Sequence, residues 1–68
     1  ITSFAELTQA DTHVYGIFFQ HIAIIAEKLD LVHSGYRIII NHGKHGQQTI
    51  EYMHAHILGN RQLNWPPG

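Results

Sequence analysis

The chain has 68 residues, no cysteine, a formal net charge of −1 and 44% hydrophobic residues. This length excludes a multidomain enzyme, because domains usually hold about 100–200 residues, and without cysteine no disulfide can reinforce a small core. Four Lys/Arg residues against five Asp/Glu residues give no basic surface for nucleic acid, and no apolar run approaches the roughly 20 residues of a membrane span.

The first predicted element is a helix over about residues 8–31. Thr8 places a hydroxyl three residues before the carboxylate of Asp11, the arrangement that caps the free N–H groups of a helix start, so the helix should begin near residues 8–11. The residues that follow at three- and four-residue spacing mark one wide, mainly apolar face: Val14, Ile17, Phe18, His21, Ile22, Ile25 and Leu29. Gly16 weakens this helix by about 1 kcal/mol relative to alanine, so we expect it to allow close approach of a neighbouring element.

Two strands are predicted after the helix, over about residues 36–41 and 50–58. The first is a short β-branched run that is apolar on both faces, and the second alternates until Gly59. A glycine-punctuated loop joins them, and the tail 60–68 cannot extend a sheet because its prolines lack an N–H. These elements predict an α+β fold in which an antiparallel sheet packs against the helix.

Alternation along the second strand places an aromatic ring and two imidazoles on one face, from Tyr52, His54 and His56. The opposite face is apolar and is expected to meet the helix. The imidazoles should then lie about 7 Å apart on an open face beside the loop, with Asn41 pointing to the same side. Neutral imidazole is abundant near pH 7 and nucleophilic, so this face predicts attack on an electrophile such as phosphorus.

Four motifs, in this order, resemble the histidine triad (HIT) superfamily, and most closely its branch of nucleoside phosphoramidases. They are an Asn41-x-Gly43 loop, a Gly46-Gln-Gln-Thr49 turn, His54-x-His56 on an apolar strand, and a terminal Trp65-Pro-Pro-Gly68. A lone His-x-His is a weak signal, but the four motifs in order are specific. The resemblance is dense over about half of the chain and extends more loosely through the predicted helix.

The resemblance implies a nucleotide-binding hydrolase similar to adenosine 5′-monophosphoramidases, which cleave a P–N bond through a nucleotidyl-histidine intermediate. His54 matches the nucleophile. His56 matches the histidine that contacts the phosphate and whose main-chain carbonyl orients the ring of the nucleophile. Asn41, Gln47 and Thr49 match positions of the nucleotide and phosphate region, with Thr49 standing where a serine is usual.

Two departures from the family pattern leave other functions open. Tyr52 occupies the first triad position, so a phenol of pKa about 10 replaces an imidazole near the nucleophile. The strands that hold the nucleoside in the family precede the helix and have no counterpart here, so residues 1–68 are expected to be the C-terminal part of one HIT-like domain. The alternatives are a catalytically impaired nucleotide-binding or protein-interaction module, and a phosphatase or nucleotidyl-transferase.

The resemblance also implies partners. The ligand would be a purine nucleotide such as AMP, or a nucleoside phosphoramidate, and the chain would form a homodimer through the predicted helix and residues 36–41. Trp65 matches a tail residue that in the family reaches near the site of the partner subunit. We expect no cofactor, no nucleic acid and no membrane, and the chain start shows no secretion signal, which favours the cytoplasm.

The seven histidines leave two further interpretations of the same residues. Zinc needs three or four converging ligands, which His54, His56 and one of the loop residues His42 and His45 would have to supply. No cysteine spacing supports such a site, so we expect no metal. The simplest alternative is that the two strand histidines are polar residues on a solvated face, with Asn41 starting a turn.

Overall fold

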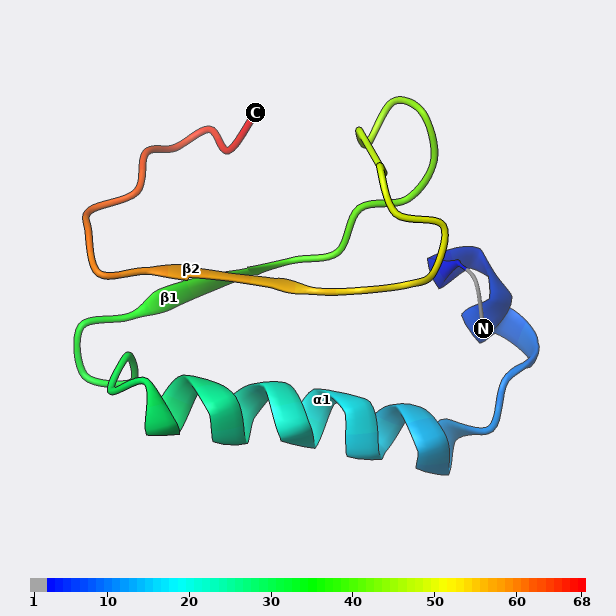
Figure 1. Cartoon of the computed structure of the whole chain (residues 1–68), viewed down its shortest axis with the longest axis horizontal. Helices are drawn as coiled ribbons and strands as arrows, with labels where there is room; N and C mark the ends of the chain where they lie inside the picture. Colours follow the sequence, from blue (N-terminus) through cyan, green and yellow to red (C-terminus); the bar gives the residue numbers. More distant parts are fainter. Residues whose placement is uncertain (1–2) are drawn as a thin grey trace.

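A computed structural model describes residues 3–68. Its elements in chain order are a 3₁₀ helix η1 (Phe4–Gln9), a helix α1 (Thr12–Lys28) and two strands, β1 (Tyr36–Ile39) and β2 (His56–Gly59). Helix α1 runs along one side of the two-stranded sheet, and the loop between the strands and the C-terminal tail lie on the other side (Figure 1). The α+β class is therefore confirmed.

Helix α1 begins at Thr12 and not at residue 8, because its capping residue is Asp11. The side chain of Asp11 accepts a hydrogen bond of 2.9 Å from the backbone N–H of His13, which satisfies one of the free donors of a helix start. Residues 4–9 form the separate helix η1, and Ala10 is extended with φ −93° and ψ 163°. The start predicted near residues 8–11 is close to the observed one, but the cap is Asp11 and not the hydroxyl of Thr8, which lies inside η1.

Helix α1 ends at Lys28, before the predicted end at residue 31. Asp30 adopts a left-handed conformation with φ 60°. Its N–H donates to Glu27 O at 3.0 Å, and the N–H of Leu31 donates to Ala26 O at 3.1 Å. This pair of bonds closes the last turn of a helix, and the left-handed residue in it is usually a glycine. Because an aspartate stands there in this chain, the sequence pattern did not predict the helix end at this point.

The buried core lies between α1 and the sheet. The buried apolar residues are Tyr15, Ile22, Ala26 and Leu31. Leu31 packs on the end of β2, where a Cβ added to Gly59 would lie 2.9 Å from Leu31 Cδ2. A Cβ added to Gly16 would meet no described atom within 4 Å, so the expected close approach at that glycine does not occur among residues 3–68.

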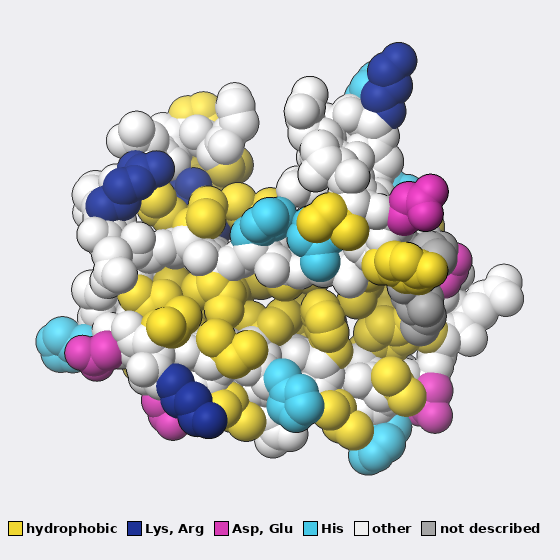
Figure 2. Space-filling view, in the orientation of Figure 1, with side chains coloured by type: hydrophobic (Ala, Val, Ile, Leu, Met, Phe, Trp, Pro, Cys, Tyr) yellow, Lys and Arg dark blue, Asp and Glu magenta, His cyan; other side chains and the backbone are white. Residues whose placement is uncertain are grey.

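The wide apolar face predicted on α1 is mostly not buried within residues 3–68. Of the seven residues assigned to it, only Ile22 is buried. A two-stranded sheet covers one side of a helix, so apolar residues on the outer side stay exposed by 42% to 53%: Val14, Ile17, Ile24 and Ile25. Figure 2 shows apolar side chains both between the sheet and α1 and along the outer side of the helix. No helix within residues 3–68 has the length and apolar character to cross a bilayer.

The two strands pair antiparallel, as expected, but both are shorter than predicted. Tyr36 pairs with Gly59 and Ile39 pairs with His56. The predicted strands 36–41 and 50–58 are therefore wrong at residues 40–41 and 50–55, which form no ladder. The chain leaves the sheet after Ile39, so residues 50–55 have no strand beside them to supply hydrogen bonds.

Candidate active site

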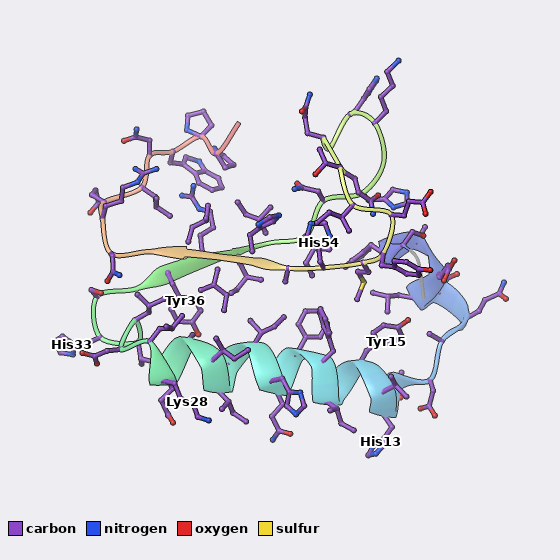
Figure 3. The ribbon with its side chains drawn as sticks, in the orientation of Figure 1. His13, Tyr15, Lys28, His33, Tyr36 and His54 are labelled. Carbon is purple, nitrogen blue, oxygen red and sulfur yellow. The ribbon has the colours of Figure 1, made fainter. Side chains whose placement is uncertain are left out.

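The two histidines of the His-x-His motif lie in contact, on the side of the chain away from α1, where Figure 3 labels His54. Their ring centroids are 4.9 Å apart with an interplanar angle of 74°. His54 is half-buried and His56 is exposed. The expected common face is confirmed for these two histidines, and their rings are closer than the backbone spacing of about 7 Å because they lean together edge to face.

One hydrogen bond fixes the chemical form of the His54 ring. Its Nδ1 lies 3.0 Å from the main-chain carbonyl oxygen of Tyr52. A carbonyl only accepts, so Nδ1 carries the proton and, in the neutral ring, Nε2 keeps a free lone pair. The expectation that the carbonyl of His56 orients this ring is wrong, because the carbonyl that holds it comes from Tyr52.

Tyr52 acts on His54 through its backbone and not through its phenol. The side chain is 63% exposed, and its hydroxyl makes no hydrogen bond within residues 3–68. Every amino acid supplies a main-chain carbonyl. A tyrosine at the first triad position therefore preserves the contact that orients the His54 ring, although it removes an imidazole from the site.

The loop before the site is a tight turn built around glycine. A Cβ added to Gly46 would lie 2.7 Å from the carbonyl oxygen of His42, so only glycine fits there without a shift of the backbone. Gln47 is exposed and left-handed with φ 58°, and its N–H donates to Lys44 O at 3.1 Å. The turn leaves the side chain of Gln47 outside any hydrogen bond within the described part of the chain.

Gln48 is a functional candidate that the sequence did not single out. Its Oε1 accepts from Gly43 N at 2.8 Å, and its Nε2 donates to Ile50 O at 3.0 Å and to Glu51 O at 3.3 Å. A side chain that bonds the backbone across a loop leaves no periodic signal in a sequence. In the sequence, Gln48 stands out only as the second glutamine of the Gly46-Gln-Gln-Thr49 turn.

The other predicted phosphate-region residues have side chains that are free to bind a ligand. Asn41 is half-buried and Thr49 is exposed, and neither side chain makes a hydrogen bond within residues 3–68. His42 and His45 are exposed on the loop. Among the described residues no three His, Cys, Asp or Glu side chains gather as a metal site would require.

The C-terminal tail folds back onto the sheet that precedes it. The guanidinium carbon of Arg37 lies 5.8 Å from the ring centroid of Trp65, a cation–π distance. Arg37 also donates from Nη2 to the carbonyl oxygen of Asn64 at 3.1 Å. Trp65 is still 79% exposed, so β1 holds the tail while most of the indole remains open to other contacts.

Comparison with protein families decides what kind of domain carries this geometry. The HIT domain model matches residues 2–63. The chain belongs to the HIT domain family. The resemblance seen in the motifs is therefore confirmed at the level of the family. A crystal structure of a HIT family hydrolase from Legionella pneumophila Philadelphia 1 confirms the HIT-like fold, with a TM-score of 0.91 and 29% identity over 100% of this chain and 61% of that chain.

Curated relatives in three organisms share part of this HIT domain. A 14 kDa zinc-binding protein of Zea mays is 35% identical over 68 residues, 100% of this chain and 52% of that protein. Protein pkiA of Dictyostelium discoideum is 61% identical over 33 residues, 48% of this chain and 26% of that protein. An uncharacterized HIT-like protein of Buchnera aphidicola is 38% identical over 64 residues, 94% of this chain and 57% of that protein. Two of the three are matched over just over half of their length.

Proposed function

We propose that the full-length protein is a nucleotide-binding hydrolase that cleaves the P–N bond of nucleoside phosphoramidates. The observation that carries this proposal is the hydrogen bond of 3.0 Å between His54 Nδ1 and Tyr52 O, because it leaves Nε2 as the nucleophilic atom. Membership of the HIT domain family and similarity to a HIT family hydrolase support hydrolysis as the reaction class.

In the first step, the lone pair of His54 Nε2 attacks the α-phosphorus and the P–N bond to the amine breaks. The departing nitrogen needs a proton, which we assign to protonated His56, whose ring centroid is 4.9 Å from that of His54. The products are a free amine and a nucleotide bonded to Nε2. General acid catalysis at this position contributes about 100-fold or more to such reactions.

In the second step, water attacks the phosphorus of the nucleotidyl-histidine and the P–Nε2 bond breaks. Neutral His56, having given up its proton, now accepts one from the water. A nucleoside monophosphate leaves and both rings return to their starting forms. The Tyr52 carbonyl stabilises the positive charge on the His54 ring in the intermediate, because Nδ1–H still donates to it.

Binding of the phosphate is assigned to polar groups around the loop. The exposed hydroxyl of Thr49 and the side chains of Asn41 and Gln47 are the donors that we propose for the phosphate oxygens. A purine nucleotide such as AMP is the proposed product. These assignments rest on the motif positions and on the freedom of the Asn41, Gln47 and Thr49 side chains from bonds within residues 3–68.

A homodimer is the second part of the proposal. The outer side of α1 exposes Val14, Ile17 and Ile25 by 42% to 53%, and burial of such a stripe against a second copy would remove apolar area from water. The open indole of Trp65 is available to a partner subunit in the same way.

Residues 3–68 do not by themselves complete a tetrahedral zinc site. The maize relative is named as a zinc-binding protein, and a tetrahedral zinc site needs three or four ligands. His54 and His56 supply two nitrogens, and no third His, Cys, Asp or Glu side chain joins them among residues 3–68. No step of the proposed reaction passes through a metal.

The experiment that tests the function compares the full-length protein with its His54→Ala variant on adenosine 5′-phosphoramidate. We expect the variant to lose at least about 1,000-fold in kcat/KM, because removal of a covalent nucleophile abolishes the two-step route. AMP release is followed by chromatography, and thermal unfolding checks that both proteins are folded. Equal turnover by the two proteins would reject the proposal.

A binding module with impaired catalysis is the second candidate, and the exposed phenol of Tyr52 favours it. Tyr52→His separates the two functions. A hydrolase that needs only the carbonyl of residue 52 changes little in rate, whereas an impaired enzyme gains a large rate increase from the restored imidazole. AMP binding without turnover in both proteins would favour the module.

A further inference from the structure

The nucleophile lies on a stretch of backbone that the sheet does not hold. Residues 50–55 form no ladder, and β2 begins only at His56. Yet the carbonyl that fixes the His54 ring belongs to Tyr52, in the middle of this stretch. Another contact must therefore fix the position of that carbonyl.

The side chain of Gln48 supplies such a contact. Its Nε2 donates one hydrogen to the carbonyl of Ile50 at 3.0 Å and the other to the carbonyl of Glu51 at 3.3 Å. These two residues lie immediately before Tyr52. The amide therefore restrains the two peptide groups that lead to the orienting carbonyl.

Gln48 is itself anchored at the other end of the loop. Its Oε1 accepts from the N–H of Gly43 at 2.8 Å, and its own backbone N–H donates to the carbonyl of Gly43 at 3.1 Å. The bond to the N–H of Gly43 is part-buried, which limits competition from water for this anchor. One residue thus ties the start of the loop to the segment that carries Tyr52.

We propose that Gln48 is a positioning residue for the nucleophile, acting through the Tyr52 carbonyl on the tautomer and orientation of the His54 ring. The proposal rests on the function assigned above to His54. Gln48 touches no reacting atom. Its role is to keep the carbonyl of Tyr52 within hydrogen-bond distance of Nδ1, so that the proton stays on Nδ1 and the lone pair on Nε2.

The neighbouring glutamine cannot take this role. Gln47 is exposed and its side chain makes no hydrogen bond within residues 3–68. The two glutamines of the turn therefore differ in function: one faces solvent where a ligand binds, and the other braces the backbone. A sequence comparison that treats them as one polar pair would miss this distinction.

Gln48→Glu in the full-length protein tests the role with almost no change of shape. The carboxylate keeps an acceptor for the N–H of Gly43 but loses both N–H donors and places negative charge beside two carbonyls. Gln20→Glu, on the exposed surface of α1, adds the same charge as a matched control. Gln48→Ala is a second variant that removes the amide without adding charge.

The first measurement is the tautomer of His54, read from two-bond proton–nitrogen NMR correlations of the neutral ring. Because this spectrum requires no turnover, it remains informative even if the proposed hydrolase activity is absent. We expect Nδ1–H in the unmodified protein and in Gln20→Glu, and a mixture of tautomers in both Gln48 variants. Together with this shift, kcat/KM for adenosine 5′-phosphoramidate should fall by about tenfold or more, because a displaced nucleophile loses its reactive geometry.

Two outcomes would overturn the proposal. One is an Nδ1–H tautomer that is unchanged in folded Gln48→Glu or Gln48→Ala. The other is loss of folding in both variants, which would assign Gln48 to stability alone. If only Gln48→Ala fails to fold, Gln48→Glu decides the question.

Discussion

His54 and His56 are two residues apart, but their backbones are held in different ways. His56 is the first residue of β2 and pairs with Ile39 across the sheet. His54 lies before the strand, in a stretch with no ladder, and its ring depends on a carbonyl in the same stretch. His56, the proposed general acid, thus lies on a regular element, whereas the proposed nucleophile is placed by individual hydrogen bonds.

This difference predicts which property a substitution in each region will change. A change in the sheet alters the stability of the domain first, because β1 and β2 pair through their backbones. A change in the irregular stretch alters the geometry of one ring. Functional residues often lie on such irregular segments, which a rigid scaffold positions.

After the loss of at least about 1,000-fold expected from His54→Ala, the next largest effect comes from removal of the histidine on the strand. His56→Ala should lower kcat/KM by about 100-fold for a phosphoramidate with a basic amine, because that leaving group needs a proton. The loss should be much smaller for an arylamine leaving group, which departs more easily. Steady-state kinetics on the two substrates measures the difference, and an equal loss on both would contradict the acid role.

A smaller effect is expected from filling the contact at the end of β2. Gly59→Ala places a Cβ about 2.9 Å from Leu31 Cδ2, so the leucine must move, and we expect a loss of about 1 kcal/mol in unfolding free energy. Urea unfolding of the full-length protein measures it. The His54 tautomer should not change, because β2 does not carry the Tyr52 carbonyl.

Gly16→Ala is the matched control for this substitution. An added Cβ at residue 16 meets no described atom within 4 Å, and alanine favours a helix interior over glycine by about 1 kcal/mol. The unfolding free energy should therefore rise. A fall would mean that another surface packs closely on this glycine, as a second copy of the chain would.

The smallest effect is expected at the residue that departs from the family motif. Tyr52→Phe should leave kcat/KM within about threefold of the unmodified protein, because the hydroxyl has no partner among the described residues and the carbonyl stays in place. Steady-state hydrolysis of adenosine 5′-phosphoramidate checks this. A large loss of rate would show that the phenol takes part in proton transfer.

Much of the regular structure was predictable because its signals are local. Helix α1 begins at Thr12, next to the start predicted near residues 8–11, although its cap is Asp11 and not Thr8. The β-branched run after residue 35 formed β1. The end of α1 was not predictable, because the left-handed residue there is Asp30 and not the usual glycine. The alternation at residues 50–55 predicted a strand, but a strand needs a partner, and the chain leaves the sheet after Ile39, the last residue of β1.

The chemistry of the site was predictable only in part. The motif placed His54 and His56 on one face, and the structure agrees. The source of the orienting carbonyl and the bracing role of Gln48 depend on hydrogen bonds to the backbone. Such bonds depend on the path of the chain in space, and the spacing of residue types along a sequence does not predict that path.

The most direct test of His54 Nε2 as the nucleophile is to identify the atom that bears the nucleotide in the intermediate. The full-length protein is mixed with adenosine 5′-phosphoramidate and quenched within one turnover, and the labelled peptide is assigned by mass spectrometry and by nitrogen–phosphorus NMR couplings. We expect an adenylyl group on Nε2 of His54. An adduct on Nδ1 of His54, an adduct on His56, or hydrolysis with no adduct at all would contradict it.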